Sequence, residues 1–242
     1  MTVTRRILGR FIDIYVYIFG SRMAARKLKH LADTCGDDVE QLVNLAFSFE
    51  YRLTTRTVHI KPAQAKTEVT ALCRIVQELN PKAIVEVGTA NGGTLFLFAR
   101  ATHPDKIISV DLPGGSFGGG YHFSLIPFFR SLGKKDVIQL IRANSHSEET
   151  LAKVQSRLKG SEVDFLFIDG DHTYEGVEQD FLMYSPLVRK GGIVAFHDIV
   201  THDPTEGCAV DRFWNRIKQS HRNVEIVEER NQKWAGIGVL HF

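Results

Sequence analysis

The sequence predicts an α/β fold, with a doubly wound and mostly parallel sheet behind a helical N-terminal extension. Three observations predict this fold. Short, continuously apolar runs recur from about residue 82, as expected of parallel strands that are covered on both faces. Amphipathic stretches alternate with these runs, which is the pattern of βαβ units. The last two runs are joined only by residues 230–235, a link that suits a hairpin rather than a helical crossover.

The apolar runs predict seven strands in chain order. The first strand is expected at 83–87, and the glycine-rich turn after it leads into a helix over 94–101. The other strands are expected at 107–111, 136–141, 163–169, 191–198, 224–229 and 236–242. Because the last pair should form a hairpin, one C-terminal strand runs antiparallel to the others. This order completes a seven-stranded, Rossmann-like sheet.

The N-terminal part of the chain differs from the rest. Residues 1–80 lack clear strand patterns, and we expect them to be mostly helical, for example over 68–79. We therefore divide the chain into an extension at 1–60 and a ligand-binding domain at 61–242. The apolar segment Phe11–Phe19 is interrupted by an aspartate and is shorter than the roughly 20 residues that span a bilayer. We interpret it as an amphipathic helix that packs on the domain or on a second subunit, and so expect a homo-oligomer. Contact with a membrane surface is the less favoured alternative.

The composition excludes several classes of protein. The chain has 242 residues, of which 43% are apolar and 24% charged, the balance of an ordinary globular protein. A net charge of +2 gives no argument for a nucleic-acid partner, and we expect none. Cys35, Cys73 and Cys208 are scattered without a C-x-x-C pair, which indicates neither a disulfide framework nor a zinc knuckle. This pattern favours a reducing compartment, so we expect a cytoplasmic protein.

Residues 112–135 form a long glycine-rich insertion after the second predicted strand. A segment of this kind is typically a binding loop or lid, or else disordered, because ordering several glycines costs backbone entropy. Its aromatic residues favour a loop that packs on another part of the molecule; they are Phe117, Tyr121, Phe123, Phe128 and Phe129.

Polar residues at the first three strand ends indicate a cofactor site. Ligands of open parallel sheets bind at the carboxyl ends of the strands. Glu86 lies at the first end, with Gly88 and Gly92 in the turn that follows, although a plain strand-to-helix turn would also explain these glycines. Asp111 ends the next strand, where a carboxylate typically binds the ribose hydroxyls of a nucleoside cofactor. After the third strand, Asn144-Ser145 could reach an adenine ring or could simply cap the loop.

The next two strand ends carry carboxylates and imidazoles. Asp169 and Asp198 should end neighbouring strands, and two such carboxylates repel unless a cation or a proton joins them. Oxygen ligands suit Mg²⁺, Mn²⁺ or Ca²⁺, and the adjacent His197 shifts the preference toward transition metals. His172 follows Asp169 by three residues and could accept a proton near neutral pH. The alternative is that Asp171 or Thr173 caps a helix while His172 only packs.

These motifs resemble those of class I S-adenosylmethionine-dependent methyltransferases. The resemblance rests on residues 84–94, 108–115 and 164–199, covers roughly 60–242, and is strongest to the cephalosporin-hydroxylase-like and macrolide-sugar O-methyltransferase group. It implies a cofactor set and a metal set. The cofactor, S-adenosylmethionine, would be held by Glu86, Gly88, Gly92, Asp111, Asn144, Ser145 and Asp169. The divalent metal, Mg²⁺ before Mn²⁺, would be held by Asp169, His197 and Asp198.

The resemblance also implies a reaction. His172 would act as the general base, and the acceptor would be a small hydroxylated molecule such as a sugar, a natural product or a catechol-like diol. The histidine at position 197 departs from the group, in which this position is often acidic. Two rivals are a nicotinamide-dependent oxidoreductase, which the glycine spacing disfavours, and a non-catalytic cofactor-binding or scaffold protein with the same fold.

Overall fold

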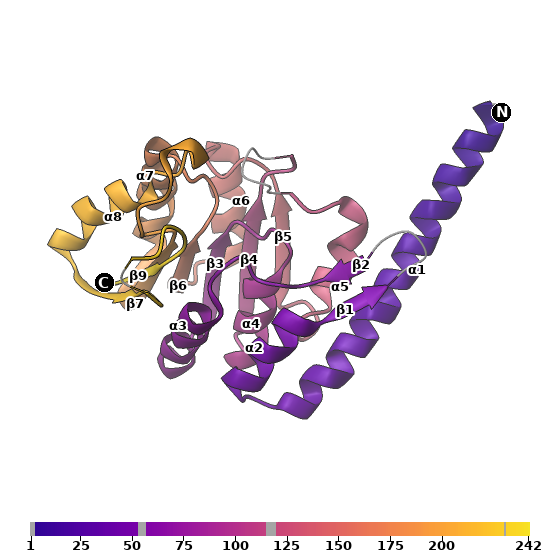
Figure 1. Cartoon of the computed structure of the whole chain (residues 1–242), viewed down its shortest axis with the longest axis horizontal. Coiled ribbons are helices and arrows are strands. Elements are labelled where there is room, and N and C mark those ends of the chain that lie inside the picture. Colours follow the sequence, from indigo (N-terminus) through magenta and orange to yellow (C-terminus); the bar gives the residue numbers. More distant parts are fainter. Residues whose placement is uncertain (1–2, 53–56, 115–119, 230) are drawn as a thin grey trace.

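The computed structural model describes residues 3–52, 57–114, 120–229 and 231–242, with side chains from Phe19 onward. Its centre is a seven-stranded sheet in the order β5-β4-β3-β6-β7-β9-β8 (Figure 1). The strands are β3 (Ala83–Val87), β4 (Lys106–Asp111), β5 (Ile138–Arg142), β6 (Val163–Ile168), β7 (Val188–His197), β8 (Arg222–Ile226) and β9 (Ile237–His241). β3 to β7 pair in parallel, whereas β9 is antiparallel to both of its neighbours. The predicted fold class is confirmed, including its single antiparallel strand.

Helices cover both faces of the sheet. The elements before β5 include α1 (Val3–Cys35), α2 (Val39–Ser48), α3 (Lys66–Leu79), α4 (Gly93–Ala101), the short helix η1 (Phe123–Leu125) and α5 (Ile126–Arg130). The later helices are α6 (Glu148–Leu158), α7 (Tyr174–Tyr184) and α8 (Val210–Ile217). Two apolar cores result, one under each group of helices.

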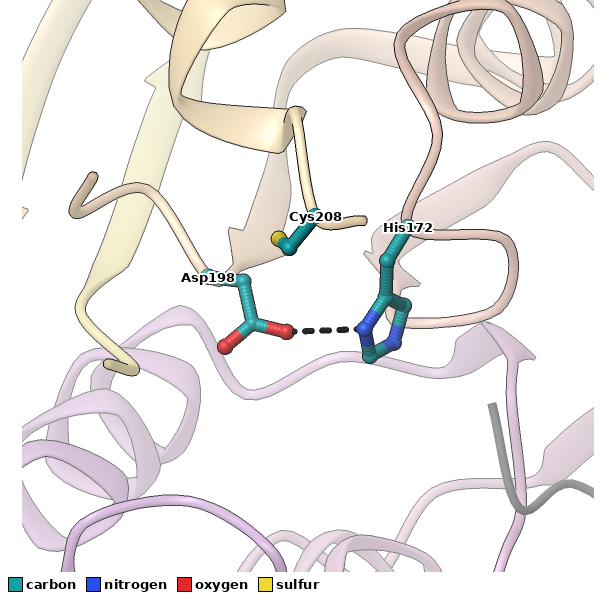
Figure 2. Close-up of side chains that lie close together, drawn as sticks. All are labelled: His172, Asp198 and Cys208. Carbon is teal, nitrogen blue, oxygen red and sulfur yellow. Dashed lines mark ion pairs between the residues drawn. The ribbon is translucent and has the colours of Figure 1, made fainter. Parts of the chain in front are cut away.

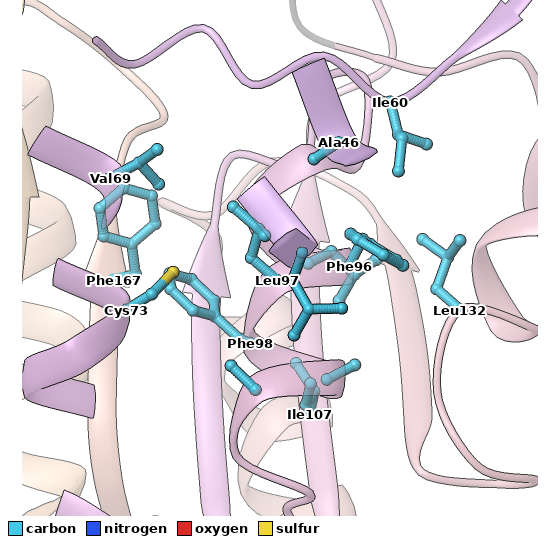
Figure 3. Close-up of a cluster of buried hydrophobic side chains, with 14 of the residues drawn as sticks. Ala46, Ile60, Val69, Cys73, Phe96, Leu97, Phe98, Ile107, Leu132 and Phe167 are labelled. Atoms are coloured by element: carbon cyan, nitrogen blue, oxygen red, sulfur yellow. The ribbon is translucent and has the colours of Figure 1, made fainter. Parts of the chain in front are cut away.

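Strand β6 shows why the strands are apolar throughout. Phe165 and Phe167 belong to the core under α2, α3 and α4, whereas Leu166 and Ile168 belong to the core under α6, α7 and α8. Successive side chains of a strand point to opposite faces, so a sheet with two covered faces needs an unbroken apolar run. Figure 3 shows the first core, where the ring edge of one aromatic residue meets the face of the other between Phe98 and Phe167, at 5.5 Å between ring centroids.

The N-terminal segment is helical but also contains a strand pair. β1 (Glu50–Arg52) and β2 (Thr57–His59) are antiparallel, which corrects the expectation that residues 1–80 lack strands. Strands of three residues are too short to produce a periodic pattern. Buried residues of α1 and α2, such as Leu28 and Leu42, share the core that covers α4. The domain boundary between residues 60 and 61 stays a prediction.

Helix α1 extends from the body of the molecule, with the N-terminus at its far end (Figure 1). In the part of the chain described, no helix is both long enough and apolar enough to cross a membrane.

The described residues of the glycine-rich insertion include η1 and α5. Tyr121, Phe128 and Phe129 are buried, and Tyr121 packs against Phe129 at 4.7 Å between ring centroids. Phe123 is exposed. The expected packing of the aromatic residues is therefore found for these three, against the protein itself. Phe117 and the glycines next to it lie outside the described residues.

Several strand boundaries differ from the predictions; for example, β7 begins at Val188 rather than at residue 191. β5 begins at Ile138 because Asp136 adopts a left-handed backbone with φ of 65°, which strands do not use. β8 ends at Ile226 rather than at residue 229, and the backbone N–H of Glu228 instead donates to the buried Glu68 on α3.

Candidate active site

A cavity of about 490 Å³ lies at the carboxyl ends of β3 to β7. β3 pairs with β4 on one side and β6 on the other, so the strand order reverses here and a crevice opens between the loops. The cavity is lined by these predicted site residues: Gly88, Asp111, Asn144, Ser145, Asp169, His172, His197 and Asp198. Glu86 and Gly92 were predicted with them but are not part of the lining.

Glu86 lies inside the sheet rather than at the cavity surface. Its side chain is completely buried and accepts hydrogen bonds from Ser109 Oγ at 2.6 Å and Thr94 Oγ1 at 2.7 Å. Burial raises the pKa of Glu86 to about 7, against the effect of these two hydrogen bonds. Through its bond with Thr94, Glu86 therefore links β3 to the first turn of α4 inside the protein.

The two predicted glycines have different neighbours. Gly88 has a φ of 96°, and a Cβ added to it would lie 2.0 Å from the carbonyl oxygen of Asp169. It is therefore required for the close approach of the β3 and β6 ends. Gly92 precedes α4, and a Cβ there would lie 2.8 Å from the ring of Phe129. Gly92 thus leaves room for the insertion.

Asp111 and Asn144 border the cavity on the β4 and β5 side. Asp111 is 5% exposed, and both of its oxygens accept from the backbone N–H of Gly120 at 3.2 Å. Burial raises the pKa of Asp111 to about 6. Asn144 Oδ1 accepts from the N–H of His146 at 3.0 Å. Asn144 therefore caps its loop, as the alternative predicted, and also faces the cavity.

Asp169, His197 and Asp198 form a compact cluster at the ends of β6 and β7. His197 Nδ1 lies 3.1 Å from Asp169 Oδ1 and 3.2 Å from Asp198 Oδ1. Burial opposes the charge of the imidazolium, but the two carboxylates raise the pKa of His197 to about 10. His197 can therefore be the cation that joins the two carboxylates. Asp198 has a φ of 62°, a backbone strain that is typical of functional sites.

The donor set of this cluster also fits a divalent ion. One ligand atom from each of the three side chains lies within 4.8 Å of the others, and two of these atoms are carboxylate oxygens. Within the described residues, His197 Nε2 is buried without a hydrogen-bond partner. The residues are thus compatible with a metal ion, which would take over the charge balance that His197 provides alone.

His172 faces the same cluster from the loop before α7. Its Nδ1 lies 3.1 Å from Asp198 Oδ2, and its Nε2 lies 3.6 Å from Asp169 Oδ1. Burial opposes protonation, but the two carboxylates raise the pKa of His172 above its usual value. The capping alternative also holds, because Thr173 Oγ1 accepts from the N–H of Gly176. Capping by Thr173 is what directs His172 into the cavity.

Several residues of the site were not predicted. Gln64 Nε2 donates to Asp169 Oδ2 at 2.7 Å, from the segment just before α3. His202 Nε2 lies 3.1 Å from Asp198 Oδ1, and Cys208 lines the cavity from the same loop. Burial is the main reason that the pKa of Cys208 rises to about 12, so its thiol is protonated at neutral pH. The loop follows directly after His197-Asp198 in the sequence, and this position is the signal that could have indicated His202 and Cys208 as site residues.

Trp234 lies at the mouth of the cavity with 48% of its surface exposed. Its loop is fixed by Glu68, a fully buried carboxylate on α3. Glu68 accepts from Gln232 Nε2 at 2.6 Å and from the N–H of Gly236 at 2.9 Å. An exposed aromatic ring on an anchored loop gives the cavity an apolar wall.

Comparisons with known proteins agree with this architecture. Residues 85–199 match a family model described as a methyltransferase domain. An O-methyltransferase from Bacillus cereus, solved in complex with SAH, superposes with a TM-score of 0.55 at 16% identity, over 91% of both chains.

Two uncharacterised curated proteins are also similar. One from Sinorhizobium fredii is 28% identical over 147 residues, which are 59% of this chain and 16% of that protein. One from Acanthamoeba polyphaga mimivirus is 32% identical over 114 residues, which are 47% of this chain and 50% of that protein. The matched part of the chain thus spans half or less of the length of these curated relatives.

Proposed function

We propose that the chain is an S-adenosylmethionine-dependent methyltransferase that methylates an oxygen atom of a small hydroxylated acceptor. Residues 85–199 match the model of a methyltransferase domain, and the fold is that of an O-methyltransferase, which supports this proposal. The observation that carries this proposal is the division of the cavity. Asp111, Asn144 and Ser145 border one part of it, and His172, His197 and Asp198 border the other. The first part suits a nucleoside, and the second suits an acceptor hydroxyl that must lose a proton.

In this proposal, Asp111 accepts hydrogen bonds from the ribose hydroxyls of S-adenosylmethionine, and Asn144 and Ser145 lie beside the adenine. The backbone at Gly88 approaches the cofactor closely. Asp169 lies where the two parts of the cavity meet. Glu86 and Gly92 are left out as direct contacts, because neither lines the cavity.

The chemistry then follows from alignment. His172 accepts the proton of the acceptor hydroxyl, and the oxygen attacks the methyl carbon in line with the carbon–sulfur bond. That bond breaks, and its electron pair stays on sulfur, which leaves S-adenosylhomocysteine. Trp234 and the insertion border the cavity and would limit the access of water.

We further propose that Asp169, His197 and Asp198 hold a divalent metal, with Mg²⁺ preferred and Mn²⁺ as the alternative. Such an ion would orient vicinal hydroxyl groups and lower the pKa of the one that reacts. A sugar, a natural product or a catechol-like diol would provide that geometry. The homo-oligomer, the cytoplasmic location and the less favoured membrane-surface contact stay predictions.

Calorimetric titration of the metal-stripped protein with S-adenosylmethionine tests the proposal. We expect micromolar binding that is lost in Asp111→Ala and kept in Asp105→Ala, an exposed aspartate just before the opposite end of β4. A separate signal for Mg²⁺ or Mn²⁺ should be lost in Asp169→Ala. Absence of cofactor binding in every condition would reject the proposal, and preferential binding of a nicotinamide cofactor would favour the oxidoreductase.

The scaffold alternative makes a different prediction once an acceptor is known. A non-catalytic protein would bind S-adenosylmethionine without turnover, and His172→Ala would then change nothing measurable. If His172 is the base, the same variant should keep cofactor affinity while methyl transfer falls by roughly 10²- to 10⁴-fold.

A further inference from the structure

A second group of metal-ligand atoms lies beside the cluster described above. His172, Asp198 and Cys208 each offer one ligand atom, and these atoms all lie within 4.8 Å of one another. Figure 2 shows the three side chains converging from separate segments of the chain. All three line the cavity, so an ion could reach them from solvent.

The two groups use different oxygens of the same carboxylate. Asp198 Oδ1 faces His197 at 3.2 Å and His202 at 3.1 Å, whereas Oδ2 faces His172 Nδ1 at 3.1 Å. The second group therefore has its own oxygen donor.

The backbone holds these ligands in position without a metal. The N–H of Ala209, next to Cys208, donates to the carbonyl oxygen of His172 at 2.8 Å. The loop that carries Cys208 is closed by a hydrogen bond of 2.8 Å from Thr201 Oγ1 to Asp211 Oδ2. Because these contacts are already made, little ordering entropy remains to be lost when an ion binds.

We propose that His172, Asp198 and Cys208 form a binding site for a transition-metal ion of the Zn²⁺ type. A thiolate, an imidazole and a carboxylate are the ligands that Zn²⁺ takes in proteins, and three protein ligands leave a fourth position toward the cavity. Mg²⁺ prefers oxygen ligands, so the sulfur separates this site from the oxygen-rich cluster beside it. Binding would release to solvent both the thiol proton of Cys208 and the proton on His172 Nδ1.

The site has a consequence that rests on the proposed function. A His172 side chain that binds Zn²⁺ through Nδ1 cannot also act as the proposed general base. Zn²⁺ should therefore inhibit methyl transfer, and the inhibition, measured relative to the zinc-free rate of each protein, should be relieved in Cys208→Ser.

Titration of the metal-stripped, full-length protein with Co²⁺ tests the site without cofactor or acceptor. Thiolate ligation of Co²⁺ gives a sulfur-to-metal charge-transfer absorption in the near ultraviolet, which oxygen and nitrogen ligands do not give. We expect this band at one equivalent of Co²⁺, and we expect added Zn²⁺ to remove it while excess Mg²⁺ does not. Cys35→Ser is the matched control, because Cys35 is another half-buried thiol that lies on α1.

The variants decide the outcome. Cys208→Ser should abolish the band and His172→Ala should weaken Zn²⁺ binding by at least about tenfold, a loss that even supporting residues of metal sites produce. Circular dichroism and thermal melting establish that both variants fold. A band that persists in Cys208→Ser, the absence of a band in the wild type, or unchanged Zn²⁺ affinity in His172→Ala would overturn the assignment. None of these results depends on whether S-adenosylmethionine binds.

Discussion

The carboxylates near the ends of β3 and β4 differ in their charge from those at the ends of β6 and β7. On the β3 and β4 side, Glu86 and Asp111 have neutral hydrogen-bond donors around them. Burial dominates there and raises the pKa of Glu86 to about 7 and that of Asp111 to about 6. On the β6 and β7 side, Asp198 is buried to the same degree and the side chain of Asp169 is 13% exposed, but both lie against His197 and His172.

The imidazoles reverse the effect of burial. Burial alone would raise the pKa of Asp169 and of Asp198, but the positive charge of His197 lowers both. The difference teaches that the partner of a carboxylate, rather than its depth, decides its charge in this protein. Asp111 therefore gains a proton below about pH 6, whereas Asp169 and Asp198 keep their negative charges to lower pH.

A substitution at Gly88 can break the close contact between the ends of β3 and β6. In Gly88→Ala, the new methyl group would collide with the carbonyl of Asp169 and would also strain a backbone with φ of 96°. We expect the free energy of unfolding, measured with urea, to fall by on the order of 4 kcal/mol.

Gly160→Ala is the matched control for this variant. Gly160 has a φ of 81° with no atom within 4 Å of an added Cβ, so only the backbone term of about 1–2 kcal/mol applies. Equal losses in the two variants would contradict a specific contact between β3 and β6.

The raised pKa of Glu86 can be tested through the pH dependence of stability. Its folded pKa of about 7 lies above the ordinary value of 4.5, so the folded protein holds a proton that the unfolded chain has lost in this window. Stability should therefore be lost as pH rises from 4.5 to 7, by on the order of 3 kcal/mol in total. Glu86→Gln stays neutral and should gain stability relative to the wild type by this amount between pH 5 and pH 8.

Urea unfolding at several pH values measures this difference. Glu148→Gln is the control, because it removes the carboxylate of an exposed residue instead of a buried one. A stability difference between Glu86→Gln and the wild type that stays constant with pH would show that Glu86 has no raised pKa.

The smallest expected effect concerns Asp111 and the cofactor. An ionised carboxylate accepts from two ribose hydroxyls, and its pKa of about 6 means that it gains a proton below that pH. The affinity for S-adenosylmethionine should then fall by about fivefold from pH 6 to pH 5, which is about 1 kcal/mol. Calorimetry at constant ionic strength measures this slope, and an affinity that does not change over this range would contradict the role of Asp111.

The sequence by itself determined the sheet and identified eight of the residues that line the cavity. Strands covered on both faces must be apolar throughout, so runs such as 163–168 identify strands without reference to their neighbours. Parallel strands end at the same edge of the sheet, so Asp111, Asp169 and Asp198 could be placed together from their positions after such runs.

Only the tertiary structure decided which side chains face the cavity and what stands beside them. Glu86 pairs with Ser109, two residues before Asp111, and it accepts hydrogen bonds from Ser109 and Thr94 inside the protein. Gln64 and Cys208 reach the site from loops whose sequences carry no periodic signal. The pKa of each carboxylate follows from burial and from neighbours that are distant in sequence, and a local pattern of residues contains neither.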